Sequence, residues 1–127
     1  MTPCVPSAVH GESLWFKLES CNPSGSYKDR FAAAEVARLA VLGVKRVVAT
    51  SSGNTGSALA AYCSRAGMEC AIVVNADAPA GKLAQMRAHG ARVLRVRGFT
   101  VDAAVTERVF GVLRGLGIPL VVSAFRY

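Results

Sequence analysis

Residues 44–56 read V-K-R-V-V-A-T-S-S-G-N-T-G, and this stretch decides the fold. Val44 to Thr50 is rich in β-branched and apolar residues, which is typical of a buried strand. A polar turn with two glycines follows, and it opens a helix that the small apolar residues predict over Asn54 to Ala66. A strand that turns directly into a helix is the first unit of a parallel α/β sheet.

The same alternation continues to the end of the chain. Further strands are predicted over Cys70–Asn75, Ala91–Val96 and Leu120–Ser123, with helices over Gly81–His89 and Thr100–Leu116. Right-handed crossovers then give a three-layer α/β fold, with a four-stranded parallel sheet in the order 3-2-1-4 and helices on both faces. That order places the third strand at an edge, where charged side chains discourage further pairing; the arginines of that strand are Arg92, Arg95 and Arg97.

A shorter unit precedes this sheet. Leu14 to Leu18 is predicted to be a short strand, and Asn22 to Ser26 is rich in turn-forming residues. Arg30 to Leu42 is predicted to be a helix that ends at Gly43. We therefore expect an N-terminal segment over residues 1–43 and a small Rossmann-like α/β domain over residues 44–127.

Composition narrows the function. Of the 127 residues 52% are hydrophobic and 18% are charged, which excludes a disordered chain. The net charge of +7 fits an anionic small ligand, and no nucleic-acid recognition motif accompanies it. No apolar run is long enough to span a bilayer, and no secretory signal is found. The four cysteines form no C-x-x-C pair and neither histidine has a cysteine neighbour, so we expect no metal site and a cytoplasmic protein.

The turn Ser51–Gly56 is the first candidate site. Ligands of open parallel sheets bind at the carboxyl ends of the strands, where the strand order reverses, and the first strand of this sheet ends here. Exposed N–H groups at a helix start attract anions, and Ser51, Ser52 and Thr55 add hydroxyl donors. We expect a carboxylate or phosphate. The alternative, a helix cap made by a serine or asparagine side chain, is compatible with it.

The second polar cluster is N-P-S-G-S-Y-K-D-R, residues 22–30. Its lysine, Lys28, lies near a predicted helix start, where the positive end of the helix disfavours the charge of an ammonium group. A lysine that is readily neutral is a good nucleophile towards carbonyl compounds. The alternative is an exposed lysine beside Asp29, which is the usual place for a lysine.

Together the two clusters resemble the fold-type II enzymes that depend on pyridoxal phosphate (PLP), a group that includes threonine synthase, cysteine synthase, serine/threonine dehydratases and the tryptophan synthase β chain. The similarity is closest to threonine synthase. It extends to G-K-L-A-Q at residues 81–85, to H-G-A at 89–91 and to the opening Thr2-Pro3. These motifs occur in the family's order and spacing over nearly the whole chain.

The resemblance implies a role for each residue. Lys28 would hold PLP as a Schiff base and then move protons on the substrate's carbons, and Asn54 would hydrogen-bond the ring oxygen of the cofactor. The substrate's α-carboxylate would be bound by Ser51, Ser52, Gly53 and Thr55. Threonine synthase, a PLP-dependent lyase of threonine biosynthesis, converts O-phosphohomoserine and water to threonine and phosphate.

The family's glycine-rich phosphate loop and its large domain are expected to be absent from these residues. The chain would then be a fragment, a split half completed by another chain, or a stand-alone domain that binds small molecules or a protein. We expect a homo-oligomer, or a complex with a missing large-domain half, because an apolar face would otherwise be exposed. A dehydratase or a cysteine-synthase reaction remains an alternative to the threonine-synthase reaction.

Overall fold

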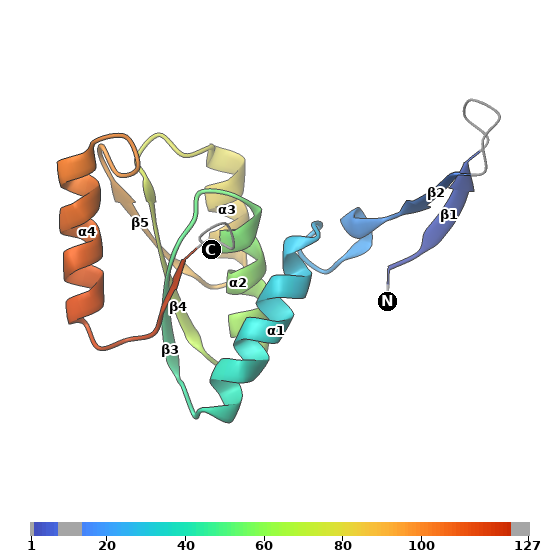
Figure 1. The fold of residues 1–127 in the computed structure, drawn as a ribbon, viewed down its shortest axis with the longest axis horizontal. Coiled ribbons are helices and arrows are strands. Elements are labelled where there is room, and N and C mark those ends of the chain that lie inside the picture. The colour runs from blue at the N-terminus through green and yellow to red at the C-terminus, as the bar shows by residue number, and fades with distance from the viewer. Residues whose placement is uncertain (1, 8–13, 123–127) are drawn as a thin grey trace.

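The computed structural model describes residues 2–7 and 14–122. Four strands, β3 (Arg46–Thr50), β4 (Glu69–Asn75), β5 (Arg92–Val96) and β6 (Leu120–Val122), form one parallel sheet in the order β5-β4-β3-β6 (Figure 1). This confirms the predicted order, with the third strand of the unit at an edge. Ser123, the last residue of the expected fourth strand, lies outside the described residues.

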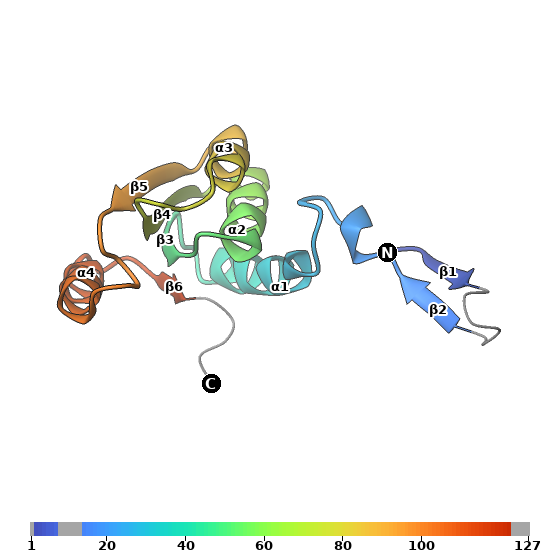
Figure 2. The ribbon, with the colours of Figure 1, turned by 90° about the horizontal axis from the view of Figure 1, so that it is seen from above.

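Three helices cover one face of the sheet and a fourth covers the other (Figure 2). They are α1 (Lys28–Val41), α2 (Asn54–Arg65) and α3 (Ala80–Ala88) on the first face, and α4 (Ala103–Gly115) on the second. The three-layer prediction is therefore confirmed. The main core lies under the first three helices, where the largest fully buried side chains include Leu39, Leu59, Ile72 and Met86. No helix in residues 2–7 and 14–122 is long and apolar enough to cross a bilayer.

The α4 face has its own smaller core, made by Val48, Val73, Phe99 and Leu113. The Phe99 ring packs against the Phe110 ring of α4 with centroids 5.9 Å apart. The helix begins at Ala103 and not at the expected Thr100, because the Asp102 side chain accepts a hydrogen bond from the Val105 N–H and caps the first turn. The apolar spacing that indicated this helix does not mark its buried side, since Val101, Val112 and Leu116 are exposed.

The N-terminal segment forms a hairpin that extends away from the sheet (Figure 1). Its strands are β1 (Cys4–Ser7) and β2 (Leu14–Lys17), which pair antiparallel, and a short 3-10 turn, η2 (Glu19–Cys21), follows them. The sequence predicted β2 but not β1. Both strands are largely exposed, and Trp15 has 65% of its surface open to solvent.

Candidate functional site

A pocket of about 480 Å³ opens at the carboxyl edge of the sheet. The ends of β3 and β4 and the turn between β3 and α2 form one wall, through Thr50, Ser51, Ser52, Gly53 and Asn75. This is the point where the strand order reverses, so the pocket lies where the parallel-sheet rule predicts a ligand.

The turn is built by its own serine. The Ser51 hydroxyl accepts hydrogen bonds from the Gly53 N–H at 3.3 Å and from the Gly56 N–H at 3.1 Å. The N-cap residue of α2 is Gly53, so the expected cap by a serine or asparagine at that position is not formed; the Ser51 hydroxyl, two residues earlier, instead accepts the Gly56 N–H of the first turn. Among the described residues nothing accepts the N–H groups of Asn54 and Thr55 in the first turn of α2. Two N–H donors at a helix start are thus available to an anion.

Gly56 lets α2 begin this close to the turn. A Cβ atom at this position would lie 2.8 Å from the Ser51 carbonyl oxygen and 2.7 Å from Cε of Met86 on α3. Both separations are well below van der Waals contact. A glycine is therefore required where the turn, α2 and α3 meet.

The opposite wall of the pocket comes from residues that the sequence interpretation missed. Phe99, Thr100, Thr106 and Phe110 line it. Asn75 joins the two walls, because its side-chain amide donates to the Phe99 carbonyl oxygen at 2.7 Å. Thr100 has a φ of 69°, which is unusual for a β-branched residue, and its N–H donates to the Thr106 hydroxyl at 2.9 Å. Asn75 was within reach of prediction, since it ends a predicted strand.

Lys28 is the first residue of α1, two residues before the predicted start of that helix. It is buried, with 7% of its surface exposed, which contradicts the alternative of an exposed surface lysine. Its Nζ lies 4.7 Å from the centre of the Tyr27 ring, within the range of a cation–π contact. Both α1 and α2 run away from the carboxyl edge of the sheet, so Lys28 and Asn54 start neighbouring helices at the same edge (Figure 1).

The loop before Lys28 is held by hydrogen bonds from two helices, α1 and α3. The Asp29 carboxylate on α1 accepts hydrogen bonds from the N–H and the hydroxyl of Ser24, at 2.9 and 2.5 Å. The Ser24 carbonyl oxygen accepts a hydrogen bond from the Gln85 amide on α3, at 3.0 Å. Burial, together with the neighbouring Asp29 carboxylate, raises the pKa of Tyr62 on α2. Asp29 therefore contacts the loop directly and neighbours Tyr62 of α2, whereas α3 reaches the loop through Ser24.

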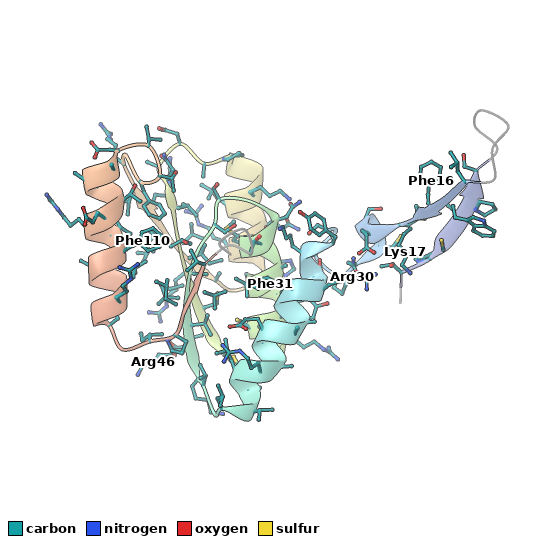
Figure 3. All side chains as sticks on the ribbon, viewed as in Figure 1. Phe16, Lys17, Arg30, Phe31, Arg46 and Phe110 are labelled. Atoms are coloured by element: carbon teal, nitrogen blue, oxygen red, sulfur yellow. The ribbon has the colours of Figure 1, made fainter. Side chains whose placement is uncertain are left out.

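Arg30 faces the other way, towards the hairpin. Its guanidinium group binds the Glu19 carboxylate at 2.7 Å and the Thr2 hydroxyl at 3.2 Å, at the junction visible in Figure 3. Hydrogen bonding to Arg30 lowers the pKa of Glu19 to about 2. The Asn22 amide also donates to Glu19, so the start of the lysine loop is fixed at its outer side as well.

The structure thus gathers only part of the predicted site in the pocket. Ser51, Ser52 and Gly53 line it, whereas Lys28, Asn54 and Thr55 do not. Asn54 is exposed at the helix start and Thr55 is buried beneath it. The predicted roles of these residues remain predictions.

Comparison with known proteins agrees with this arrangement. The family described as pyridoxal-phosphate dependent enzyme matches residues 1–111. The chain belongs to this family. Among its curated members, threonine synthase of Bacillus sp. (strain ULM1) is 40% identical over 112 residues, and that of Methanocaldococcus jannaschii is 43% identical over 93 residues. These matches cover 84% and 72% of the chain but 32% and 23% of the relatives, so the chain spans about a third or less of their length.

Solved structures of pyridoxal-phosphate dependent enzymes share the fold. A pyridoxal 5'-phosphate-dependent aspartate racemase superposes with a TM-score of 0.80 at 32% identity, over 99% of this chain and 41% of its own. An O-ureido-L-serine synthase superposes with a TM-score of 0.81 at 25% identity, over 94% of this chain and 40% of its own. The resemblance to fold-type II enzymes, with PLP as the family's cofactor, is thereby confirmed.

Proposed function

We propose that this chain supplies the lysine and the carboxylate-binding turn of a PLP-dependent enzyme of the threonine-synthase type, acting on O-phosphohomoserine. The observation that carries the proposal is Lys28, a buried amine at the start of α1, at the same edge of the sheet as the Ser51–Thr55 turn. The choice of reaction is supported by threonine synthases that are 39–43% identical to the chain.

The residues present fit the cofactor in their chemistry. PLP needs a primary amine for its aldehyde carbon, and Lys28 supplies one in a buried place. Asn54 offers an exposed amide that makes no hydrogen bond to any other described residue, so it is available to the ring oxygen. A Cβ at Gly53 would meet nothing within 4 Å, which leaves room for a ligand against the turn.

When bound, PLP supplies an electron sink for the electron pair of a bond at the substrate's α-carbon. The protein's own part is to bind, orient and move protons. The free N–H groups of Asn54 and Thr55, together with the Ser51 and Ser52 hydroxyls, bind the substrate's carboxylate at the start of α2. Lys28 would hold the cofactor, and its amine would carry protons to and from the substrate's carbons as general base and general acid.

The rest of the proposed active site lies in a large domain that would cradle the cofactor phosphate. We propose that the unit of residues 44–127, with the N-terminal segment 1–43, works as the small-domain half of such an enzyme. The exposed apolar side chains of the hairpin support a complex with that half, since Leu14, Trp15 and Phe16 are 43–65% exposed. In sedimentation at high concentration we expect self-association of the chain alone; a clean monomer contradicts this part.

The first experiment asks whether Lys28 holds the cofactor. The chain is incubated with PLP and reduced with borohydride, and the labelled peptide is identified by mass spectrometry. We expect label on Lys28 and its loss in Lys28→Ala, with no change in Lys45→Ala, whose lysine is exposed beside β3. Absence of label in the parent chain, or equal label in Lys28→Ala, overturns the proposal.

The second experiment tests the reaction. The chain is mixed with the C-terminal part of the Bacillus threonine synthase, and phosphate release from O-phosphohomoserine is measured. Serine and O-acetylserine serve as matched substrates, because a dehydratase or cysteine-synthase reaction uses the same lysine and turn. Turnover of O-phosphohomoserine alone supports the threonine-synthase reaction. Turnover of only serine or only O-acetylserine overturns it in favour of the dehydratase or the cysteine-synthase reaction.

A further inference from the structure

The residue after Lys28 is a buried carboxylate to which the proposed chemistry gives no part. Asp29 is 1% exposed, which is rare for an aspartate unless its oxygens are satisfied. Both oxygens accept hydrogen bonds from Ser24, one from the backbone N–H and one from the hydroxyl. The five-residue separation folds the chain before Lys28 into a closed loop.

The loop depends on Asp29 for its shape. Gly25 takes a φ of 81° and donates its N–H to the Asn22 carbonyl oxygen at 2.8 Å, which turns the chain towards Ser26. The Ser26 hydroxyl then accepts the Lys28 N–H at 3.3 Å, and the Ser26 carbonyl oxygen accepts the Asp29 N–H at 3.2 Å. The backbone of Lys28 is therefore positioned by a loop whose other end is bonded to the side chain of Asp29.

Asp29 also connects this loop to the neighbouring helices. Tyr62 on α2 neighbours its carboxylate, and burial together with this carboxylate raises the pKa of the Tyr62 phenol. Ser24, which Asp29 holds, is bonded on its carbonyl side to Gln85 of α3. Because α2 also carries the Ser51–Thr55 turn at its start, this network fixes the lysine loop relative to the helix that binds the carboxylate in the proposed site.

We infer that Asp29 is a positioning residue, which acts through Ser24 to hold the Lys28 amine where it can bond to the cofactor's aldehyde carbon. This inference rests on the proposed function, because it takes Lys28 as the cofactor lysine. In that bonding step the amine nitrogen adds to the aldehyde carbon and one water molecule leaves, with no net oxidation. Asp29 itself contacts neither partner in that step. Removal of the Asp29 carboxylate releases the loop. Lys28 then keeps its amine, but the amine is no longer held in position.

The experiment measures two properties of the Lys28 amine in the same samples, its accessibility and its reactivity towards PLP. Reductive methylation with formaldehyde reports how accessible each lysine is, and borohydride reduction with PLP reports how readily each lysine bonds the cofactor. Lys45, which is exposed, is the internal reference in every molecule. The variants are Asp29→Asn and the milder Ser24→Ala, which keeps one of the two hydrogen bonds. Glu35→Gln is the matched control, since it changes an acid to an amide on the same helix, where Glu35 pairs with Arg38.

We expect methylation of Lys28 relative to Lys45 to rise about tenfold in Asp29→Asn, while PLP labelling of Lys28 relative to Lys45 falls about tenfold. Ser24→Ala changes both ratios in the same directions by a smaller factor. If Asp29→Asn does not fold, Ser24→Ala alone tests the inference. Glu35→Gln leaves both ratios at the parent value. Unchanged methylation, or a rise in both ratios, overturns the inference. A parent chain with no PLP label at Lys28 instead overturns the proposed function, so the two failures are distinct.

Discussion

The lysine loop, residues 22–28, and the Ser51–Gly56 turn both lead into a helix start at the same edge of the sheet. They differ in the sequence separation of the hydrogen bonds that hold them. The turn is local, because Ser51 bonds two N–H groups within five residues and Gly56 allows the close approach. The lysine loop is closed by Asp29, five residues from Ser24, and is also bonded to a distant side chain, Gln85, which is 61 residues from Ser24. The Ser51–Gly56 turn therefore forms with its own strand and helix, whereas the lysine loop is completed only when α3 has packed beside α1.

The strongest way to break this comparison is Gly56→Ala. The new Cβ meets the Ser51 carbonyl oxygen, which belongs to the backbone and cannot move aside as the Met86 side chain can. We expect a loss of about 2–3 kcal/mol in the free energy of unfolding, measured by urea denaturation. Gly81→Ala is the control, since its Cβ meets nothing within 4 Å in α3, and it should stabilise by up to about 1 kcal/mol. A neutral Gly56→Ala would show that the turn is not locally constrained.

Ser51→Ala tests the turn through its hydrogen bonds. The variant removes the acceptor for the Gly53 and Gly56 N–H groups, and we expect a loss of about 1 kcal/mol, seen as a lower thermal midpoint. Ser64→Ala, at an exposed position near the end of the same helix, should leave the midpoint unchanged. Equal thermal midpoints for the two variants would show that the Ser51 hydrogen bonds do not stabilise this turn.

Gln85→Leu tests the distant support of the lysine loop. Loss of the bond to the Ser24 carbonyl oxygen should cost only about 0.5 kcal/mol in global stability, because this hydrogen bond is only partly buried. Amide hydrogen exchange at Gly25 should accelerate, while exchange at Gly56 in the turn stays as in the parent chain. Lys82→Met is the control, since it removes the partner of Gln85 and leaves the bond to Ser24. Faster exchange at both sites would mean that loop and turn form one unit.

The smallest effect concerns the outer anchor of the lysine loop. The pKa of Glu19 lies at about 2 in the folded chain, below the ordinary value of 4.5, so the Arg30 contact contributes fully above about pH 4.5 and is lost as the pH falls through 2. The protection factor of the Asn22 amide, its exchange rate relative to that of an unfolded chain at the same pH, should therefore fall across this window in the parent chain and be lower and nearly independent of pH in Glu19→Gln. Glu35→Gln should keep the parent's pH dependence at Asn22.

Much of the sheet could be predicted because its signals are local. Val47 and Val48 fill a continuous apolar run, and Gly90 ends α3 with a φ of 84°, as the expected helix end requires. The start of α1 was placed two residues late, because Tyr27 precedes the helix and gives no side-chain cap. The strand β1 was missed because it is four residues long and contains Pro6, which breaks the pattern of a strand.

One wall of the pocket could be predicted from the sequence, and the opposite wall could not. The turn at Ser51 follows from the strand order, since the end of β3 is where that order reverses. The pocket wall at Thr100 does not, because its positive φ is set by a bond to Thr106 across the start of α4 and not by a glycine. The burial of Lys28 likewise depends on the packing of α1 against α2, and no residue near Lys28 in the sequence predicts that packing.

The exposed hairpin gives the molecule an optical probe. Trp15 is the single tryptophan of the sequence, and it lies on β2, away from the sheet that carries the pocket (Figure 1). In water its fluorescence emits at long wavelength, and coverage by an apolar surface shifts that emission to the blue. The Trp15 emission spectrum therefore reports whether a partner covers the hairpin, and chemical labelling reports the state of Lys28. Binding at the hairpin and at Lys28 can thus be measured separately in the same sample.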